Sequence, residues 1–370
     1  MERLKYEIPV YVVLIALMIY GVFLLNSAVD LKDRILVFKQ MAWNVAAVLS
    51  MILFTVLRIN DLRSLGWYAY IVSVILMSLV LIFGVEINGA RRWFNFGLFS
   101  FQPSELMKVG LVLLLPQFLM RKKYRDLLTS LLLTLGAILL AMMEPDLGSA
   151  VLFMFIWFVL IFMRGIWDRF LLWAMGIGGG FAPVIFFYVL KDYQRERILA
   201  FLNPKAHFTG AGYNVLQAMK AIGSGGFLGR GYGLGFMNKA GYVPMDKTDF
   251  IISVAGEELG FVGILILIAL YTLLFISIYR IFRISRSLYE ELVISGVMAV
   301  FFFHVFENLG MNMGLLPVTG IPLPFVSYGG SSTITFGILI SIVLKVSMGG
   351  TRAKPLGMFE SQIKKGGEWL

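Results

Sequence analysis

The sequence contains no cysteine and only two histidines among its 370 residues. Without cysteine there is no disulfide and no thiolate metal site, and two histidines are too few for a histidine-cluster metal centre. Charged residues are also scarce, at 15% of the chain, against about a quarter in a soluble domain. No strand is expected before the densest glycine run, which excludes a Walker loop or a dinucleotide fingerprint there.

Apolar side chains are abundant instead. They make up 59% of the residues, with 32 Phe and 7 Trp, and the mean hydropathy is +0.84. A transmembrane helix needs roughly 20 mostly apolar residues, and such runs recur along the whole chain. The composition therefore predicts an all-α integral membrane protein. The net charge of +10 fits cytoplasmic loops and anionic headgroups, and no nucleic-acid-binding module is visible.

We expect ten transmembrane helices in a single polytopic domain covering residues 1–370. The first apolar run is long enough to remain as a membrane anchor, so no cleavable signal peptide is expected. The ten expected spans are approximately Pro9–Ser27, Val37–Leu57, Trp67–Val85, Glu105–Met120, Leu127–Met143, Ser149–Met163, Phe170–Leu190, Phe250–Tyr279, Leu292–Leu309 and Ser331–Met348.

The basic residues predict the orientation of these spans. If the N-terminus is cytoplasmic, the inward-facing segments hold 18 of the 32 Lys and Arg, as the positive-inside rule requires. Both termini, including the tail 349–370, are then cytoplasmic. The large loop 191–249, between spans seven and eight, faces outward. Within it, "YNVLQAMKAI" has helical periodicity and is expected along the interface, whereas the glycine-dense part that follows would let backbone pack closely.

The stretch "KTDFIISVAGEELGF" places acidic residues around the start of the eighth span. Asp249 has two interpretations, a helix N-cap or a half-desolvated carboxylate with a raised pKa that acts as a general base. Glu257 and Glu258 lie further inside, where a charge costs roughly 3 kcal/mol and needs a partner.

The stretch "NGARRWFNFGLFSFQPSELMKVG" contains a second set of charges. Glu105 and Lys108 are three residues apart and share a helix face. They form either a structural ion pair or a site where Lys108 meets an anionic substrate. Arg91 and Arg92, beside Trp93, suit phosphate or headgroup contact at the interface.

Two further motifs interrupt apolar runs. In "MEPDLGS", Glu144 and Asp146 are explained by a tight turn but also permit a divalent cation. In "GLLPVTGIPLPFVSYGGSS", three prolines and four glycines predict a re-entrant loop against a polar cavity before the tenth span. Ser327, Ser331 and Ser332 are hydrogen-bonding groups there, and His304 has the position of a buried core residue.

Taken together, "GARRWFNFGLFSFQPSELMK", "EPDLGSA", "GYNVLQAMKAIGSGGFLGRGYG", "KTDFIISVAGEELGFVG" and "GLLPVTGIPLPFVSYGGSS" closely resemble the SEDS family of peptidoglycan glycosyltransferases. This family includes RodA, FtsW and SpoVE, and the resemblance spans almost the whole chain. The short tails and "DYQRERILAFLNP" are most like the RodA, or elongation, branch. Family members usually have histidine before the Thr-Asp pair, where this chain has Lys247.

The resemblance implies an inverting polymerase of lipid II, in the bacterial cytoplasmic membrane, with its active site on the extracytoplasmic side. It implies that Asp249 is the catalytic carboxylate, that Glu105 and Lys108 form the family's buried pair, and that Asp146 is the acid of its "EPDLG" motif. We expect Lys108, Arg195, Arg197 or a divalent cation such as Mg²⁺ or Mn²⁺ to stabilise the departing pyrophosphate.

The remaining substrate contacts are expected from Arg91, Ser327 and Ser331. The resemblance also implies a partner, a class B penicillin-binding protein that crosslinks the strands, besides the surrounding membrane lipid. The alternative function is a flippase of lipid-linked sugars, which would need polar groups along a path through both leaflets. A purely structural scaffold would not require Asp249.

Overall fold

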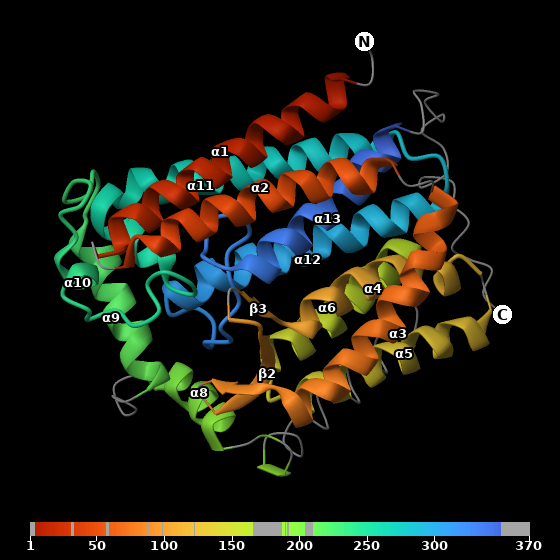
Figure 1. Cartoon of the computed structure of the whole chain (residues 1–370), viewed down its shortest axis with the longest axis horizontal. Helices are drawn as coiled ribbons and strands as arrows, with labels where there is room; N and C mark the ends of the chain where they lie inside the picture. Colours follow the sequence, from red (N-terminus) through yellow and green to blue (C-terminus); the bar gives the residue numbers. More distant parts are fainter. Residues whose placement is uncertain are drawn as a thin grey trace.

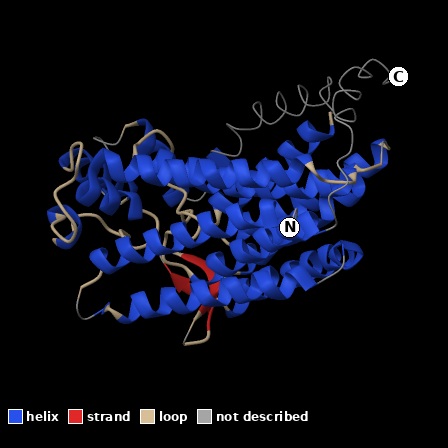
Figure 2. Ribbon diagram, turned by 90° about the horizontal axis from the view of Figure 1, so that it is seen from above, coloured by secondary structure: helices blue, strands red, loops and turns tan. Residues whose placement is uncertain are grey.

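The protein is described here by a computed structural model, which defines residues 4–30, 33–56, 59–87, 89–97, 99–121, 123–165, 187–188, 190, 192–203 and 210–348. Long helices run side by side in one bundle, and short helices gather at the end of the bundle away from the N-terminus (Figure 1). Apart from one small sheet, the described chain is helices and connecting loops (Figure 2).

Eight of the described helices are long and apolar enough to cross a membrane. They are α1 (Leu4–Ala28), α2 (Ile35–Val56), α3 (Ile59–Phe83), α5 (Tyr124–Met143), α6 (Leu147–Arg164), α11 (Ile251–Arg283), α12 (Leu288–Asn312) and α13 (Gly330–Met348). The remaining helices are α4 (Pro103–Leu119), α8 (Asp192–Leu202), α9 (Ala211–Ser224) and α10 (Phe236–Lys239).

The eight helices match eight of the ten expected spans. The fourth expected span corresponds to α4, which has 17 residues and is buried along most of its length. The seventh, Phe170–Leu190, lies almost entirely outside the described residues. The multi-span helical architecture is therefore confirmed.

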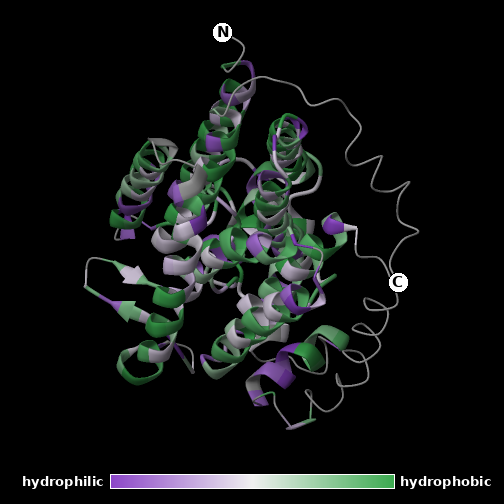
Figure 3. Ribbon diagram, turned by 90° about the vertical axis from the view of Figure 1, so that its right-hand side faces the viewer, coloured by the Kyte–Doolittle hydropathy of each residue, from purple (hydrophilic) through white to green (hydrophobic). Residues whose placement is uncertain are grey.

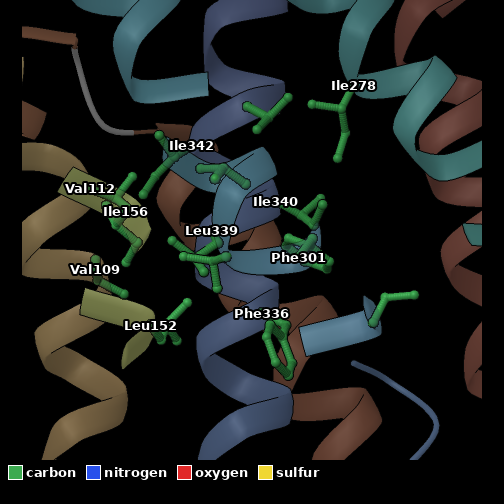
Figure 4. Close-up of a cluster of buried hydrophobic side chains, with 14 of the residues drawn as sticks. Val109, Val112, Leu152, Ile156, Ile278, Phe301, Phe336, Leu339, Ile340 and Ile342 are labelled. Atoms are coloured by element: carbon green, nitrogen blue, oxygen red, sulfur yellow. The ribbon is translucent and has the colours of Figure 1, made fainter. Parts of the chain in front are cut away.

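The centre of the bundle is built from α4, α12 and α13, whose side chains are buried on nearly all faces. Phe301 and Phe336 pack with aliphatic side chains from α4 and α6 in one continuous cluster (Figure 4). By contrast, the peripheral helices expose large apolar residues outward, and hydrophobic colouring extends over their outer faces (Figure 3). In water such exposure would be costly, so these faces are suited to lipid.

A small antiparallel sheet connects α3 to α4 and was not expected from the sequence. Its strands are β1 (Val85–Ile87), β2 (Ala90–Asn95) and β3 (Ser100–Phe101), in the order β1-β2-β3. β1 and β3 have only three and two residues, and the six residues of β2, ARRWFN, do not alternate between apolar and polar side chains, so no period-two pattern marks the sheet. The sheet corrects the all-α expectation and places the "ARRW" stretch on an extended strand.

The glycine-dense segment is bonded to a break inside α11. Gly260 has φ 67° and ψ −159°, which interrupts the helix. The backbone groups that lose their helical partners at this break form hydrogen bonds with the loop. The carbonyls of Glu257 and Glu258 accept from Arg230 N and Gly231 N, each at 3.0 Å. After the break, Phe261 N donates to Gly226 O at 3.0 Å. Backbone polar groups at membrane depth need such partners, so the loop and the break stabilise each other.

The two glutamates before this break hold the same loop through their side chains. Glu257 accepts hydrogen bonds from Met237 N at 2.7 Å and Asn238 N at 3.1 Å, at the start of α10. Glu258 accepts from Ser27 Oγ at 2.7 Å and from Gly233 N at 3.0 Å. The expectation that both buried acids have partners is confirmed.

The proline-rich segment between α12 and α13 is irregular but buried, and side chains from the helices satisfy its carbonyls. Tyr271 donates to Pro324 O at 2.6 Å, and Asn308 donates to Ile321 O at 2.8 Å. Ser327 donates to Thr248 O at 2.5 Å, which joins this loop to the segment before α11. These bonds hold the loop next to Asp249.

The contact between the glycine segment and α11 predicts a stability difference between two glycines. A Cβ on Gly225 would lie 1.9 Å from Gly256 O, whereas one on Gly223 would meet nothing within 4 Å. Gly225→Ala should therefore destabilise the protein by about 1–3 kcal/mol, since backbone must move. The matched control Gly223→Ala should cost nothing. Thermal unfolding of both variants in detergent tests this, and equal midpoints would contradict the packing.

Candidate active site

A cavity of about 350 Å³ lies where the sheet, the proline-rich loop and the starts of α4, α6 and α13 converge. It is lined by aromatic, charged and small polar side chains from segments far apart in the sequence. The residues that line it include Trp43, Arg92, Gln102, Glu105, Lys108, Asp146, Ser149, Leu152, Asp249, His304, Gly320, Tyr328 and Ser331.

Asp249 lies in the turn before α11 and lines this cavity. Its backbone carbonyl accepts hydrogen bonds from Asn308 Nδ2 at 2.9 Å and Asn312 Nδ2 at 3.0 Å, both on α12. Gly320 of the proline-rich loop has φ +78°, and a Cβ there would lie 3.2 Å from Asp249 Oδ2. The backbone of Asp249 is thus anchored to α12, and Gly320 leaves room beside its carboxylate.

The structure does not support the N-cap interpretation of Asp249. The N-cap of α11 is Phe250, and no side chain makes a capping hydrogen bond there. Burial raises the pKa of the Asp249 carboxyl, while the nearby guanidinium groups of Arg92 and Arg197 lower it. These opposing effects give a desolvated carboxylate beside two cations, the arrangement that suits a general base.

Glu105 and Lys108 form a buried ion pair on the first turns of α4. Lys108 Nζ lies 2.7 Å from Glu105 Oε1, and both side chains are at most 5% exposed. Lys108 Nζ also lies 3.1 Å from His304 Nε2 on α12. The structural ion pair is confirmed, and the pair also lines the cavity, so contact between Lys108 and a substrate stays a prediction.

Asp146 is the N-cap of α6 and uses both oxygens on protein partners. It accepts from Ser149 N at 3.2 Å and from Gln102 Nε2 at 2.9 Å, and pairs with Arg92 at 3.4 Å. Burial and the charge of Asp146 raise the pKa of neighbouring Glu144 to about 9, so Glu144 is protonated near neutral pH. The two acids of "EPDLG" therefore do not form a ready cation site.

Within the described part of the chain, no group of three or more His, Asp or Glu side chains is arranged to hold a metal. Asp249 is the remaining cavity acid with neither a buried salt bridge nor a capping role. A divalent cation would need substrate phosphate oxygens to complete its ligands, as is usual for Mg²⁺.

The structure brings together five of the residues proposed from the sequence. Asp249, Glu105, Lys108, Asp146 and Ser331 all line the cavity, and Ser331 donates to Ser100 O of β3 at 2.8 Å.

The other four proposed residues do not line it. Arg91 pairs with Glu86 at 3.2 Å and is 54% exposed. Arg195 pairs with Asp192 at 3.6 Å. Arg197 lies behind the cavity wall and donates to Val318 O and Thr319 O at 3.3 Å. Ser327 is buried and bonds to backbone.

The cavity also contains residues that the sequence did not single out as site residues, notably Gln102, Trp43 and His304, and it contains Arg92 in place of Arg91. Arg92 and its neighbour Trp93 both line the cavity whereas Arg91 does not, so the alternation of side chains along a strand would not have separated the two arginines. Nothing in the sequence near His304 or Trp43 indicates that they meet Lys108 or the loop before α13.

The fold and the cavity define a polytopic membrane protein with a buried, carboxylate-bearing site at one end of its helical bundle. A family model described as "Cell cycle protein" (FTSW_RODA_SPOVE) matches residues 5–351. The chain therefore belongs to the FtsW/RodA/SpoVE family, and the expected membership of the SEDS family is confirmed.

Individual relatives support the same assignment. Peptidoglycan glycosyltransferase MrdB of Escherichia coli K12 is 39% identical over 287 residues, which cover 75% of this chain and 78% of that protein. The probable peptidoglycan glycosyltransferase FtsW of Geobacter sulfurreducens is 32% identical over 363 residues, covering 93% and 95%.

Two solved structures are also similar. One is a chain from a peptidoglycan synthase complex, described as coordinating polymerization and crosslinking, with TM-score 0.81, 34% identity and coverage of 92% and 97%. The other is the rod shape determining protein RodA of Thermus thermophilus, with TM-score 0.69, 32% identity and coverage of 92% and 95%.

The buried ion pair predicts a large effect of removing one charge. Glu105→Gln leaves Lys108 buried without a counter-charge, which typically costs about 3–5 kcal/mol. Glu86→Gln removes the partner of Arg91 in an exposed pair and should cost about 0–1 kcal/mol. The thermal midpoints of the two purified variants provide the comparison, and an unchanged midpoint for Glu105→Gln would argue against the pairing.

Proposed function

We propose that the protein polymerises peptidoglycan glycan strands from lipid II, with Asp249 as the general base. The single observation that carries this is the position of Asp249, partly desolvated in a polar cavity and close to two arginines. Relatives at 39% and 32% identity bear the name peptidoglycan glycosyltransferase, which confirms that class of enzyme for the family of this chain.

The proposed reaction follows from the charges around the cavity. An acceptor sugar hydroxyl attacks the anomeric carbon of the donor, and Asp249 takes the hydroxyl proton as the new carbon–oxygen bond forms. The bond from the anomeric carbon to the lipid pyrophosphate breaks at the same time, so an α-linked centre becomes a β-1,4 linkage. The negative charge on the leaving pyrophosphate is stabilised by the cationic side of the cavity, where Arg92 lies.

Trp43 and Tyr328 also line the cavity, and their aromatic rings offer flat surfaces on which sugar rings can pack. The lipid part of the substrate would remain among the exposed apolar faces of the bundle, where membrane lipid also packs. A divalent cation, Mg²⁺ or Mn²⁺, would bind through the substrate phosphates and a single cavity carboxylate.

The topology is part of the same proposal. Ten spans, cytoplasmic termini and a cavity at the extracytoplasmic face of the bacterial cytoplasmic membrane would bring Asp249 to the leaflet where glycan strands are made. The loop 191–249 and the proline-rich loop would then both lie on the outer side, the latter as a re-entrant segment. The role in cell elongation rests on resemblance to the RodA branch.

The flippase alternative is less well supported. Beyond Lys108, the α4 residues Leu111–Leu115 are fully buried in the hydrophobic core, so the cavity is closed on that side. A class B penicillin-binding protein is the proposed partner, since a similar solved chain comes from a peptidoglycan synthase complex.

Asp249→Asn should abolish polymerisation while preserving the fold, because the amide keeps the shape but cannot accept the proton. The matched control is Asp246→Asn, three positions away and outside the cavity, which should retain activity. Purified protein with lipid II, with and without the partner, is assayed for glycan strands on a gel. Polymer formed by Asp249→Asn would exclude the base assignment.

The pH dependence of the rate should report the same carboxylate. Asp249 must be ionised, so the rate should fall as pH falls through its raised pKa. Arg92 lowers that pKa, so Arg92→Gln should shift the acidic limb to higher pH. Arg91→Gln, one residue away on the opposite strand face, should leave the limb in place. Equal shifts of the acidic limb in the two variants would show that the charge of Arg92 does not specifically lower the pKa of Asp249.

A further inference from the structure

The innermost wall of the cavity carries a group of three buried polar side chains, Glu105, Lys108 and His304, which we name the inner triad. Their exposed fractions are 4%, 2% and 1%. Lys108 Nζ bridges the other two, at 2.7 Å from Glu105 Oε1 and 3.1 Å from His304 Nε2. All three line the cavity.

His304 has a defined tautomer in this arrangement. Its Nδ1 lies 2.9 Å from Pro322 O, and a carbonyl oxygen only accepts, so Nδ1 carries the hydrogen. Nε2 then has a free lone pair and accepts from Lys108. The ring is also held edge-on to Phe336, with centroids 4.9 Å apart at 90°. The histidine is therefore neutral, and the inner triad carries one positive and one negative charge.

Two hydrogen-bonding groups remain after these contacts are made. A lysine ammonium has three N–H donors, and Lys108 uses two of them on Glu105 and His304. Glu105 Oε2 is buried and has no hydrogen-bond partner in the described structure. An unpaired buried carboxylate oxygen is costly, so a ligand group that satisfies it gains that energy.

The chemistry of these two groups selects the ligand. A hydroxyl can donate to Glu105 Oε2 and accept from Lys108 through the same oxygen. A pyrophosphate offers only acceptors and negative charge, so it would leave Glu105 Oε2 unpaired and lie against that carboxylate. Arg92 also has a carboxylate partner, Asp146 at 3.4 Å, but its Nε has no hydrogen-bond partner in the described structure and remains for a phosphate oxygen. Leu152 also lines the cavity and belongs to the buried hydrophobic cluster (Figure 4), and polar contacts are stronger where such apolar side chains exclude water.

We propose that the inner triad is the subsite for a non-reacting sugar hydroxyl of the glycan substrate, and that His304 is a positioning residue that orients Lys108. This inference rests on the proposed function and refines it. It moves the pyrophosphate away from Lys108, where the sequence alone had placed it, and toward Arg92.

Binding of two soluble probes to the purified full-length protein tests the assignment without requiring activity. The probes are the neutral methyl glycoside of N-acetylglucosamine and inorganic pyrophosphate, and the readout is the thermal unfolding midpoint. Each probe should raise the wild-type midpoint by about 1–2 °C at saturating concentration. The double variant Glu105→Leu, Lys108→Met replaces the pair with apolar groups of similar size, which usually preserves folding.

The double variant should lose the glycoside shift and keep the pyrophosphate shift, and Arg92→Gln should do the reverse. The proposal fails if the wild type shows no glycoside shift, if the double variant keeps it, or if the double variant loses the pyrophosphate shift. A wild-type protein that makes no polymer from lipid II would instead refute the proposed function, while the two shifts would still report on the inner triad.

Two single variants test the positioning role of His304 without altering charge. Gln at this position can reach Lys108 with its oxygen, whereas Asn can mimic only the Nδ1 donor to Pro322. His304→Gln should therefore keep the glycoside shift and a near-normal KM for lipid II, and His304→Asn should raise KM at least tenfold with a smaller change in kcat. The opposite order would show that the histidine matters only for anchoring the loop.

Discussion

The structure depends on one constraint: a polar group inside an apolar bundle must find its partner within the chain. This constraint explains why irregular backbone surrounds the cavity. The break at Gly260 is stable because the glycine segment bonds to the freed backbone groups. The proline-rich loop is stable because Tyr271 and Asn308 donate to its carbonyls. Asn308 also donates to the backbone carbonyl of Asp249, so the residue that stabilises the loop also anchors the backbone from which the carboxylate extends.

The cavity separates its charges into two regions. Near Asp249, Arg92 pairs with Asp146 at 3.4 Å, but its Nε has no hydrogen-bond partner within the described residues, so a donor remains for a departing anion. At the inner triad, Lys108 is neutralised by Glu105 and fixed by neutral His304, which suits a hydroxyl. Both regions are shielded from water, so electrostatic interactions within them are strong. The distance between each charge and its counter-charge therefore determines which ligand group each region can bind. The apolar core beneath Leu152 supplies this shielding.

The sequence predicted the candidate site unevenly. Asp249, Glu105 and Lys108 lie in long motifs, and their burial follows from charges placed inside apolar runs. Arg91 and Arg92 could not be separated, because which of two adjacent arginines lines the cavity depends on how β2 packs against the rest of the chain. His304 looked like an ordinary core residue, because its contact with Lys108 crosses 196 positions of sequence. The seventh expected span lies almost entirely outside the described residues, so that part of the topology stays a prediction.

The sequence by itself determined that this is a multi-span membrane protein and which segments carry its polar motifs, because hydropathy and composition act locally along the chain. Only the tertiary structure decided which charges meet. Asp146 accepts a hydrogen bond from Gln102 and forms an ion pair with Arg92, both from another part of the chain. The carboxylate of Asp249 lies next to Gly320 of the proline-rich loop. Such pairings depend on how helices pack and loops return, and it is burial at those meeting points that turns ordinary side chains into a site.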